Sequence, residues 1–250
     1  EYLLNNKDIK HGKISVCFSP DEEIGHGAAL MDLERVGADY GYTVDGGEVN
    51  EINFETFNAS FAKISIKGVS VHPGSAKDKM INASLVAMEF NSLLPAGEIP
   101  SKTENYEGFF HLTEIRGTTD SAELSYIIRD HDAKRFKERE EKIGAAVAEI
   151  NRRYGKDTAR AEIREQYRNM AEVLGRDSEP VRRAVKAIEK AGYESVTVPI
   201  RGGTDGAQLS FRGLPCPNLG TGGYGFHGPY EHITSEHLEK MTEILINVMI

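Results

Sequence analysis

Apolar and polar side chains alternate in the stretch Phe61-Ala62-Lys63-Ile64-Ser65-Ile66-Lys67. A period of two places alternate residues on opposite faces, so this stretch predicts a β-strand with one buried and one solvent-facing side. A helical pattern follows at Ile81–Leu94, and two further alternating runs occupy Phe109–Arg116 and Ala122–Arg129. The region therefore contains both strands and helices.

A second helix follows these strands, and residues 159–168 suit a last strand. The apolar face of that helix carries Phe136, Ile143, Val147, Ile150 and Tyr154. The resulting order is β-α-β-β-α-β, which is the ferredoxin-like arrangement with both helices on one face of an antiparallel sheet. We expect this inserted α+β domain to occupy residues 58–169.

The flanking regions, residues 1–57 and 170–250, show a different alternation. Before the insertion we expect strands at Ile14–Phe18 and Tyr40–Val44 around a helix near Ala28–Val36. After it we expect a helix with Pro180 in its first turn that stops at Gly192, a strand at Ser195–Ile200, a helix after Asp205 and a last helix from Ser235. Alternating strands and helices indicate an α/β layer interrupted by the insertion.

Composition narrows the classes of function. The 250 residues are 39% hydrophobic, enough for a real core, and carry a net charge of −9. That charge argues against nucleic acid or an anionic membrane as the main partner. No apolar run is long enough to cross a bilayer and no signal peptide is visible. Cys17 and Cys216 lack a CxxC spacing, so we expect small core residues in a cytoplasmic protein.

Two adjacent carboxylates stand out in the run Pro20-Asp21-Glu22-Glu23-Ile24-Gly25-His26-Gly27. They follow the expected strand Ile14–Phe18 and precede a turn and a helix. One carboxylate could bind a metal ion while its neighbour acts as a general base. The alternative is structural, because acidic residues in the first turn of a helix are favoured by the helix dipole.

Two later motifs have the same ambiguity when each is taken alone. Thr43-Val44-Asp45-Gly46-Gly47 places a carboxylate after a strand, but Asp before glycines also forms turns. Tyr224-Gly225-Phe226-His227-Gly228 places an imidazole among glycines, which suits either a ligand or a surface loop. Their joint occurrence with the acidic pair, in this order, favours a metal site.

Together these motifs resemble the M20 family of dinuclear zinc peptidases, most closely its tripeptide-cleaving members. The resemblance implies an α/β fold: an M20-type catalytic α/β domain, here partial, with an inserted ferredoxin-like lid and dimerisation domain. It implies two zinc ions, with cobalt or manganese possible. In that pattern Glu22 is the general base, Glu23 and His227 share one ion, and Asp45 binds the other.

The resemblance also implies residues that contact the substrate. His72, in Val71-His72-Pro73-Gly74, matches a histidine that reaches the partner subunit's site and stabilises an oxyanion; otherwise it is a helix-entry residue. Asn82 matches an asparagine facing the same neighbouring site. Arg201, in a Gly-rich loop between strand and helix, matches a clamp for the substrate's terminal carboxylate. Arg129 is a second such candidate, with a solvated salt bridge as its alternative.

Part of the family's ligand set has no match here. A histidine in a His-x-Asp motif and a bridging aspartate precede the paired glutamates in that family, whereas His11 is followed by Gly12-Lys13. The chain also opens as if already inside a helix, so we expect an excerpt of a longer protein, inactive by itself.

The implied function is metal-dependent hydrolysis of tripeptides by a homodimer formed through the inserted domain. The alternatives are another M20 amidohydrolase (a dipeptidase, aminoacylase or desuccinylase) and a non-catalytic dimerisation scaffold.

Overall fold

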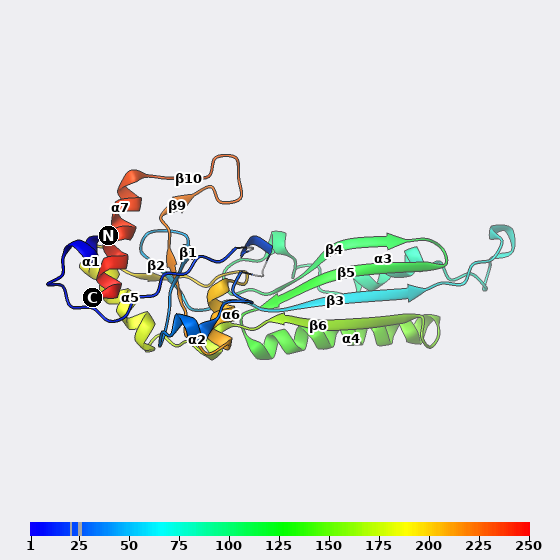
Figure 1. Cartoon of the computed structure of the whole chain (residues 1–250). Coiled ribbons are helices and arrows are strands. Elements are labelled where there is room, and N and C mark those ends of the chain that lie inside the picture. Colours follow the sequence, from blue (N-terminus) through cyan, green and yellow to red (C-terminus); the bar gives the residue numbers. More distant parts are fainter. Residues whose placement is uncertain (21, 25–26) are drawn as a thin grey trace. The chain divides into compact units, whose positions relative to one another are not determined.

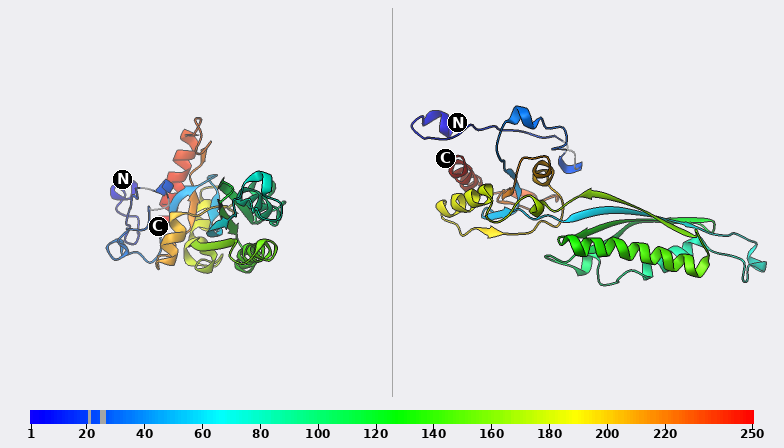
Figure 2. Two further views of the ribbon diagram at one scale, coloured as in Figure 1. Left: turned by 90° about the vertical axis from the view of Figure 1, so that its right-hand side faces the viewer. Right: turned by 90° about the horizontal axis from the view of Figure 1, so that it is seen from below.

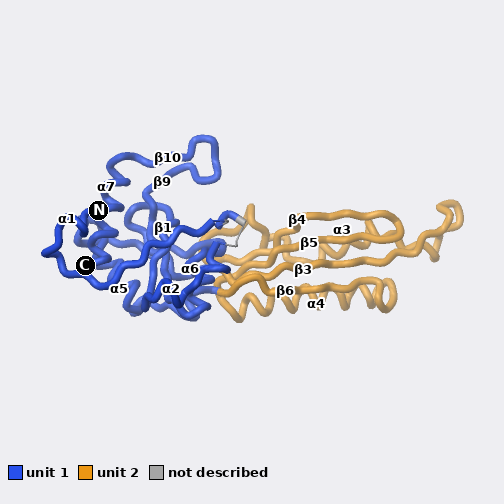
Figure 3. Tube along the Cα trace, in the orientation of Figure 1, with its two compact units in different colours: residues 1–56, 169–250 blue, residues 57–168 orange. Residues whose placement is uncertain are grey.

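The computed structural model describes residues 1–20, 22–24 and 27–250. The chain divides into two compact units, residues 1–56 with 169–250 and residues 57–168 (Figure 3). The sequence placed these boundaries at 57/58 and 169/170, one residue later in each case. Each unit has a sheet and a hydrophobic core of its own.

The unit of residues 57–168 contains a four-stranded antiparallel sheet and two long helices. Its elements run β3 (Asn58–Lys67), α3 (Ala83–Ser92), β4 (Phe109–Gly117), β5 (Ser121–Asp130), α4 (Ala133–Tyr154) and β6 (Ala159–Tyr167). The strand order across the sheet is β4-β5-β3-β6. Helices α3 and α4 contact each other and the sheet, and cover one of its faces (Figures 1 and 2). The expected β-α-β-β-α-β order is therefore confirmed.

The alternation in β3 decides which face is covered. Ala62, Ile64 and Ile66 are fully buried, whereas Ser65 and Lys67 are exposed. All five residues of the expected apolar face of α4 belong to this core or pack against it. Short 3-10 turns at η2 (Pro73–Ser75) and η3 (Pro100–Lys102) lie in the connections.

The second unit contains a mixed sheet with the order β1-β8-β2-β7. Its strands are β1 (Thr43–Gly46), β2 (Glu51–Asn53), β7 (Val196–Thr197) and β8 (Asn218–Gly220). β1 pairs parallel with β8 and β2 parallel with β7, whereas β2 and β8 are antiparallel. A short hairpin joins β9 (Gly223–Tyr224) to β10 (His232–Ile233).

Helices complete this unit. They are α1 (Tyr2–Asn5), α2 (Leu33–Val36), α5 (Glu179–Lys190), α6 (Asp205–Phe211) and α7 (Ser235–Met249), with 3-10 turns η1 (Glu22–Ile24) and η4 (Met170–Glu172). The core forms where α5 and α7 pack together beside β2. Pro180 lies in the first turn of α5, and Gly192, just past its end, adopts φ +92°, as the sequence pattern indicates. No helix in the described part of the chain is long and apolar enough to span a membrane.

Several local expectations are wrong. Residues 14–18 form no strand, and Phe18 is 93% exposed, because no neighbouring strand among the described residues pairs with this segment. Cys17 is consequently exposed, whereas Cys216 is buried as expected. The helix expected near 28–36 is only α2, which Asp32 caps and which ends at Gly37 with φ +56°.

Candidate active site

The metal-ligand candidates come from three separate segments of the chain. Glu22 and Glu23 lie on η1, Asp45 lies at the end of β1, and His227 lies in the loop of the β9–β10 hairpin. Nε2 of His227 is 3.2 Å from Oε2 of Glu23. Both side chains are largely exposed, at 78% and 74%, so this pair is open to solvent and to a ligand.

Glu22 and Asp45 are close enough to the other charged groups for their pKa values to be affected. Burial raises the pKa of the Glu22 carboxyl, and the charges of Asp45, Asp205 and Glu23 raise it further. Burial also raises the pKa of Asp45, with added repulsion from Glu23 and Asp205. His227 lowers both pKa values. The site is therefore a concentration of carboxylates whose repulsion a bound cation would relieve.

The backbone at His227 is unusual. Its φ is +58°, in the left-handed region, where a non-glycine residue costs roughly 1–2 kcal/mol. Gly225, two residues earlier, has φ +68°, and its carbonyl accepts a hydrogen bond from the N–H of Gly228 at 3.0 Å. The turn thus holds the backbone of His227 in a strained conformation, and such conformations cluster at functional positions.

The donor set fits zinc chemically, because it combines carboxylates with an imidazole. Geometrically it is incomplete: no group of three or more ligating side chains converges within residues 1–20, 22–24 and 27–250. Glu23 and His227 could share an ion, and Asp45 would need partners beyond those described. Asp21 and His26, which lie inside the acidic motif, fall outside the described residues.

Asp205 is a member of this group that the sequence did not single out. It is 5% exposed, begins α6 and accepts hydrogen bonds from Ser19 and Ala28 on either side of the acidic pair. From the sequence alone, Asp205 is an ordinary residue for the start of a helix. A hint of a further role is that Thr204, the residue before it, can cap the helix, so the carboxylate of Asp205 is not needed as a cap.

Arg201 belongs to the same unit as these residues and lies half-buried in the loop between β7 and α6. The three other predicted substrate contacts, His72, Asn82 and Arg129, lie in the unit of residues 57–168. Arg201 precedes Thr204, the N-cap of α6, by three residues in the sequence.

Two of the predicted contacts in the unit of residues 57–168 have local partners. His72 precedes η2, and its Nδ1 accepts from the N–H of Gly74 at 3.2 Å. Asn82 is the N-cap of α3, and its Oδ1 accepts from the N–H groups of Ser84 and Leu85. These capping contacts account for both residues locally and leave their side chains at least partly accessible.

Arg129 does not form the solvated salt bridge that was the alternative to a substrate contact. It is only 9% exposed, so the solvated salt bridge is wrong. Its Nη1 donates to the carbonyls of Ser60 and Ile128, at 3.1 and 2.9 Å, and its guanidinium lies 5.2 Å from the ring centroid of Tyr167. Burial lowers its pKa, and Tyr167 partly offsets that effect.

This chain belongs to peptidase family M20/M25/M40, whose pattern matches residues 1–250. It is 51% identical over 249 residues to a peptidase T of Clostridium perfringens and 51% identical to that of Parabacteroides distasonis. In both cases all of this chain is covered but only 61% of the relative. The chain thus spans about three-fifths of the length of these relatives.

Solved structures agree on the architecture. The aminopeptidase PepT of Bacillus cereus superposes with a TM-score of 0.86 at 25% identity, covering 99% of this chain and 66% of that one. The YXEP protein of Bacillus subtilis, a dinuclear metal-binding peptidase of the M20 family, superposes with a TM-score of 0.66 at 20% identity, covering 93% and 63%. The resemblance to the M20 family and the α/β fold class are confirmed.

Proposed function

We propose that the protein is a metal-dependent aminopeptidase that removes the N-terminal residue from tripeptides. The main support is the contact between Glu23 and His227, at 3.2 Å, beside the carboxylates of Glu22 and Asp45. The high identity to enzymes named peptidase T supports the choice of substrate class.

In this proposal Glu23 and His227 would hold one metal ion and Asp45 would hold a second. Two zinc ions, or cobalt or manganese, would supply Lewis acidity that polarises the scissile carbonyl and acidifies water. Glu22 accepts the proton of the attacking water and passes it to the leaving amine. Its raised pKa suits this role, because a general base works best when its pKa approaches the working pH.

The remaining predicted residues bind the substrate. Arg201 pairs with the C-terminal carboxylate, because a guanidinium can hold a carboxylate through two parallel hydrogen bonds. His72 stabilises the oxyanion, with Asn82 and Arg129 as further polar contacts. The proposal includes a homodimer through residues 57–168, in which His72 serves the partner's site, and a cytoplasmic location.

The 250-residue chain alone should hydrolyse tripeptides poorly. Among the described residues two ligands meet, and a zinc site with two protein ligands is neither closed nor tightly held. The family's remaining ligands belong to a region that the resemblance places before Glu22.

A chimera tests the proposal directly. The part of C. perfringens peptidase T that precedes its match to this chain is fused ahead of Glu1, and the purified product is assayed with zinc or cobalt. We expect hydrolysis of tripeptides in preference to dipeptides and N-acyl amino acids. Chelation should abolish the activity and added metal should restore it.

The matched control is Glu22→Gln in the same chimera, which keeps side-chain size but removes the base. We expect a loss of roughly 10²- to 10⁴-fold in kcat. A folded chimera that hydrolyses only N-acyl amino acids would favour another M20 amidohydrolase. A folded, metal-loaded chimera that hydrolyses none of these substrates would favour the scaffold.

A further inference from the structure

Asp205 is a buried carboxylate that helix capping does not explain. Thr204 is the N-cap of α6, and its hydroxyl oxygen accepts from the N–H of Ala207 at 3.1 Å. The carboxylate of Asp205 instead contacts residues that lie 186 and 177 positions earlier in the chain.

Each oxygen of this carboxylate accepts a hydrogen bond from a different limb of the segment that contains these residues. The hydroxyl of Ser19 donates to Oδ2 at 2.9 Å, and the N–H of Ala28 donates to Oδ1 at 3.0 Å. Glu22 and Glu23 lie between these two anchor points. The carboxylate therefore connects the two limbs of the acidic loop, a name used for residues 19–20, 22–24 and 27–28.

The close approach requires glycine at position 27. A Cβ atom placed there would lie 2.3 Å from Oδ2 of Asp205, closer than any real contact. Gly27 and Ala28 are both buried, so the downstream limb packs against α6 rather than extending into solvent.

The residue after α6 strengthens this attachment. Arg212 donates from Nη1 to the carbonyl of Ala28 and from Nη2 to the carbonyl of Met31, the latter at 2.6 Å. Ala28 also packs in a small apolar cluster with Leu209 of α6. The downstream limb is thus held by groups at both ends of this helix.

We infer that Asp205 is a positioning residue that fixes the acidic loop so that Glu22 and Glu23 face Asp45 and His227. This inference rests on the proposed function. Asp205 is 5% exposed, and burying an ionisable carboxylate costs more than burying a neutral acceptor, so the fold alone would be served better by a neutral residue. What only a carboxylate supplies is two strong, charge-assisted acceptors at once, one for each limb.

The first test uses the 250-residue chain and does not depend on catalysis. Hydrogen exchange of residues 27–31 is compared in the wild type, Asp205→Ala and Thr204→Ala. Loss of a bond to a charged acceptor should speed exchange at Ala28 by about tenfold or more. Thr204→Ala, the matched control, weakens the cap of the same helix but should leave this exchange unchanged. Unchanged exchange in Asp205→Ala would overturn the anchoring.

The second test measures kcat and KM in the chimera. Asp205→Ala should lower kcat by roughly 10- to 100-fold with little change in KM, as loss of a supporting contact does in metal sites. Ser19→Ala, which removes one of the two bonds, should give a smaller loss of the same kind. Asp205→Asn should fall between Asp205→Ala and the wild type, since its amide oxygen can still accept one bond.

The results can count against the positioning role of Asp205 or against the proposed function, and the two cases can be told apart. An unchanged kcat in Asp205→Ala, or an equal loss in Thr204→Ala, would overturn the positioning role. An inactive wild-type chimera would count against the proposed function instead, and hydrogen exchange alone would then decide whether Asp205 anchors the loop.

Discussion

Glu22 and Asp45 show how a site can cost a folded chain stability. Their pKa values are raised because burial and neighbouring carboxylates disfavour the ionised form. An ordinary paired carboxylate has the opposite shift and stabilises the fold at neutral pH. Here the ionised group is less favourable in the folded than in the unfolded state, so each of these two carboxylates lowers the free energy of unfolding at neutral pH.

We therefore expect Glu22→Gln to raise the free energy of unfolding at pH 7. The folded-state pKa of Glu22 exceeds its ordinary value of 4.5, so the gain is present above the folded pKa and is lost as the pH falls toward 4.5. Urea unfolding at pH 7 and at pH 4 measures this difference. Glu34→Gln, at an exposed position in the same unit, is the control and should show a smaller dependence on pH.

A destabilised Glu22→Gln variant at pH 7, or a gain of equal size at both pH values, would contradict the electrostatic explanation.

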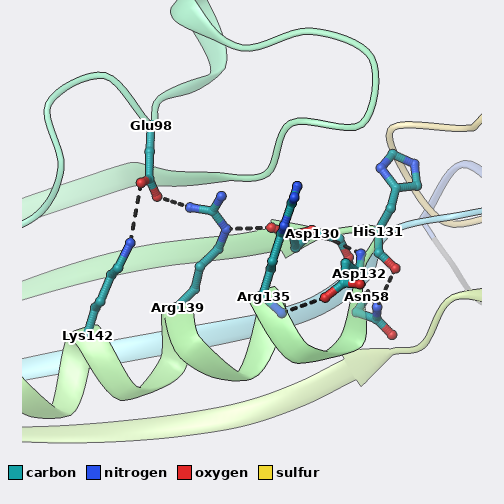
Figure 4. Close-up of polar contacts among 8 residues, drawn as sticks. All are labelled: Asn58, Glu98, Asp130, His131, Asp132, Arg135, Arg139 and Lys142. Carbon is teal, nitrogen blue, oxygen red and sulfur yellow. Dashed lines mark hydrogen bonds and ion pairs between the residues drawn. The ribbon is translucent and has the colours of Figure 1, made fainter.

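At the scale of elements, an ionic network joins four segments of the unit of residues 57–168 (Figure 4). Arg139 of α4 donates from Nε to Asp130 at the end of β5, at 2.8 Å, and also pairs with Glu98. Lys142, one turn later, lies 3.3 Å from Glu98. Asn58, at the start of β3, donates to the carbonyl of Asp130 at 3.2 Å. These contacts attach the N-terminal half of α4 to the end of β5, and the end of β5 to the start of β3.

Asp130→Ala should reduce the free energy of unfolding by about 1–3 kcal/mol, because it leaves Nε of Arg139 without its buried acceptor while the ion pair with Glu98 remains. Asp130 is 1% exposed, so solvent does not screen the pair. Glu123→Ala breaks the exposed pair between Lys63 and Glu123 on the same sheet and should cost about 0–1 kcal/mol. Urea unfolding of the wild type, Asp130→Ala and Glu123→Ala measures both losses of stability. Equal losses in the two variants would contradict the role of burial.

At the scale of the whole chain, residues 57–168 form a unit that is continuous in sequence. Its core contains residues of this unit alone. Its first and last strands are neighbours: Ala59 of β3 lies opposite Tyr167 of β6, so the chain enters and leaves at the same place. An insertion with adjacent ends disturbs the host fold little.

We expect a protein of residues 57–168 alone to fold cooperatively. Its sheet of four strands covered by two helices buries a complete core, which is the usual requirement for independent stability. Circular dichroism should show native helix and strand content and one thermal transition. A fragment without a transition would show that this unit depends on the remainder of the chain.

The ferredoxin-like order could be predicted because its signals are local. The period of two in residues 61–67 and the apolar face of α4 each repeat within a few residues, and the observed core uses those same side chains. The limits of α5 follow likewise from Pro180 and Gly192. The metal-ligand candidates were found as motifs, each a short combination of residue types beside a strand or glycine turn.

Long-range pairing decided the rest. Residues 14–18 have a strand's composition, but a strand forms only where a neighbour supplies hydrogen bonds, and none of the described strands does. The hydrogen bond from Ser19 to Asp205 joins residues 186 positions apart, and no local pattern marks it. Composition and periodicity determined the helices and strands of residues 57–168. Tertiary structure alone decided that residues 14–18 stay unpaired and that Asp205 contacts Ser19 and Ala28, because hydrogen bonds depend on distance in space and not on separation in the sequence.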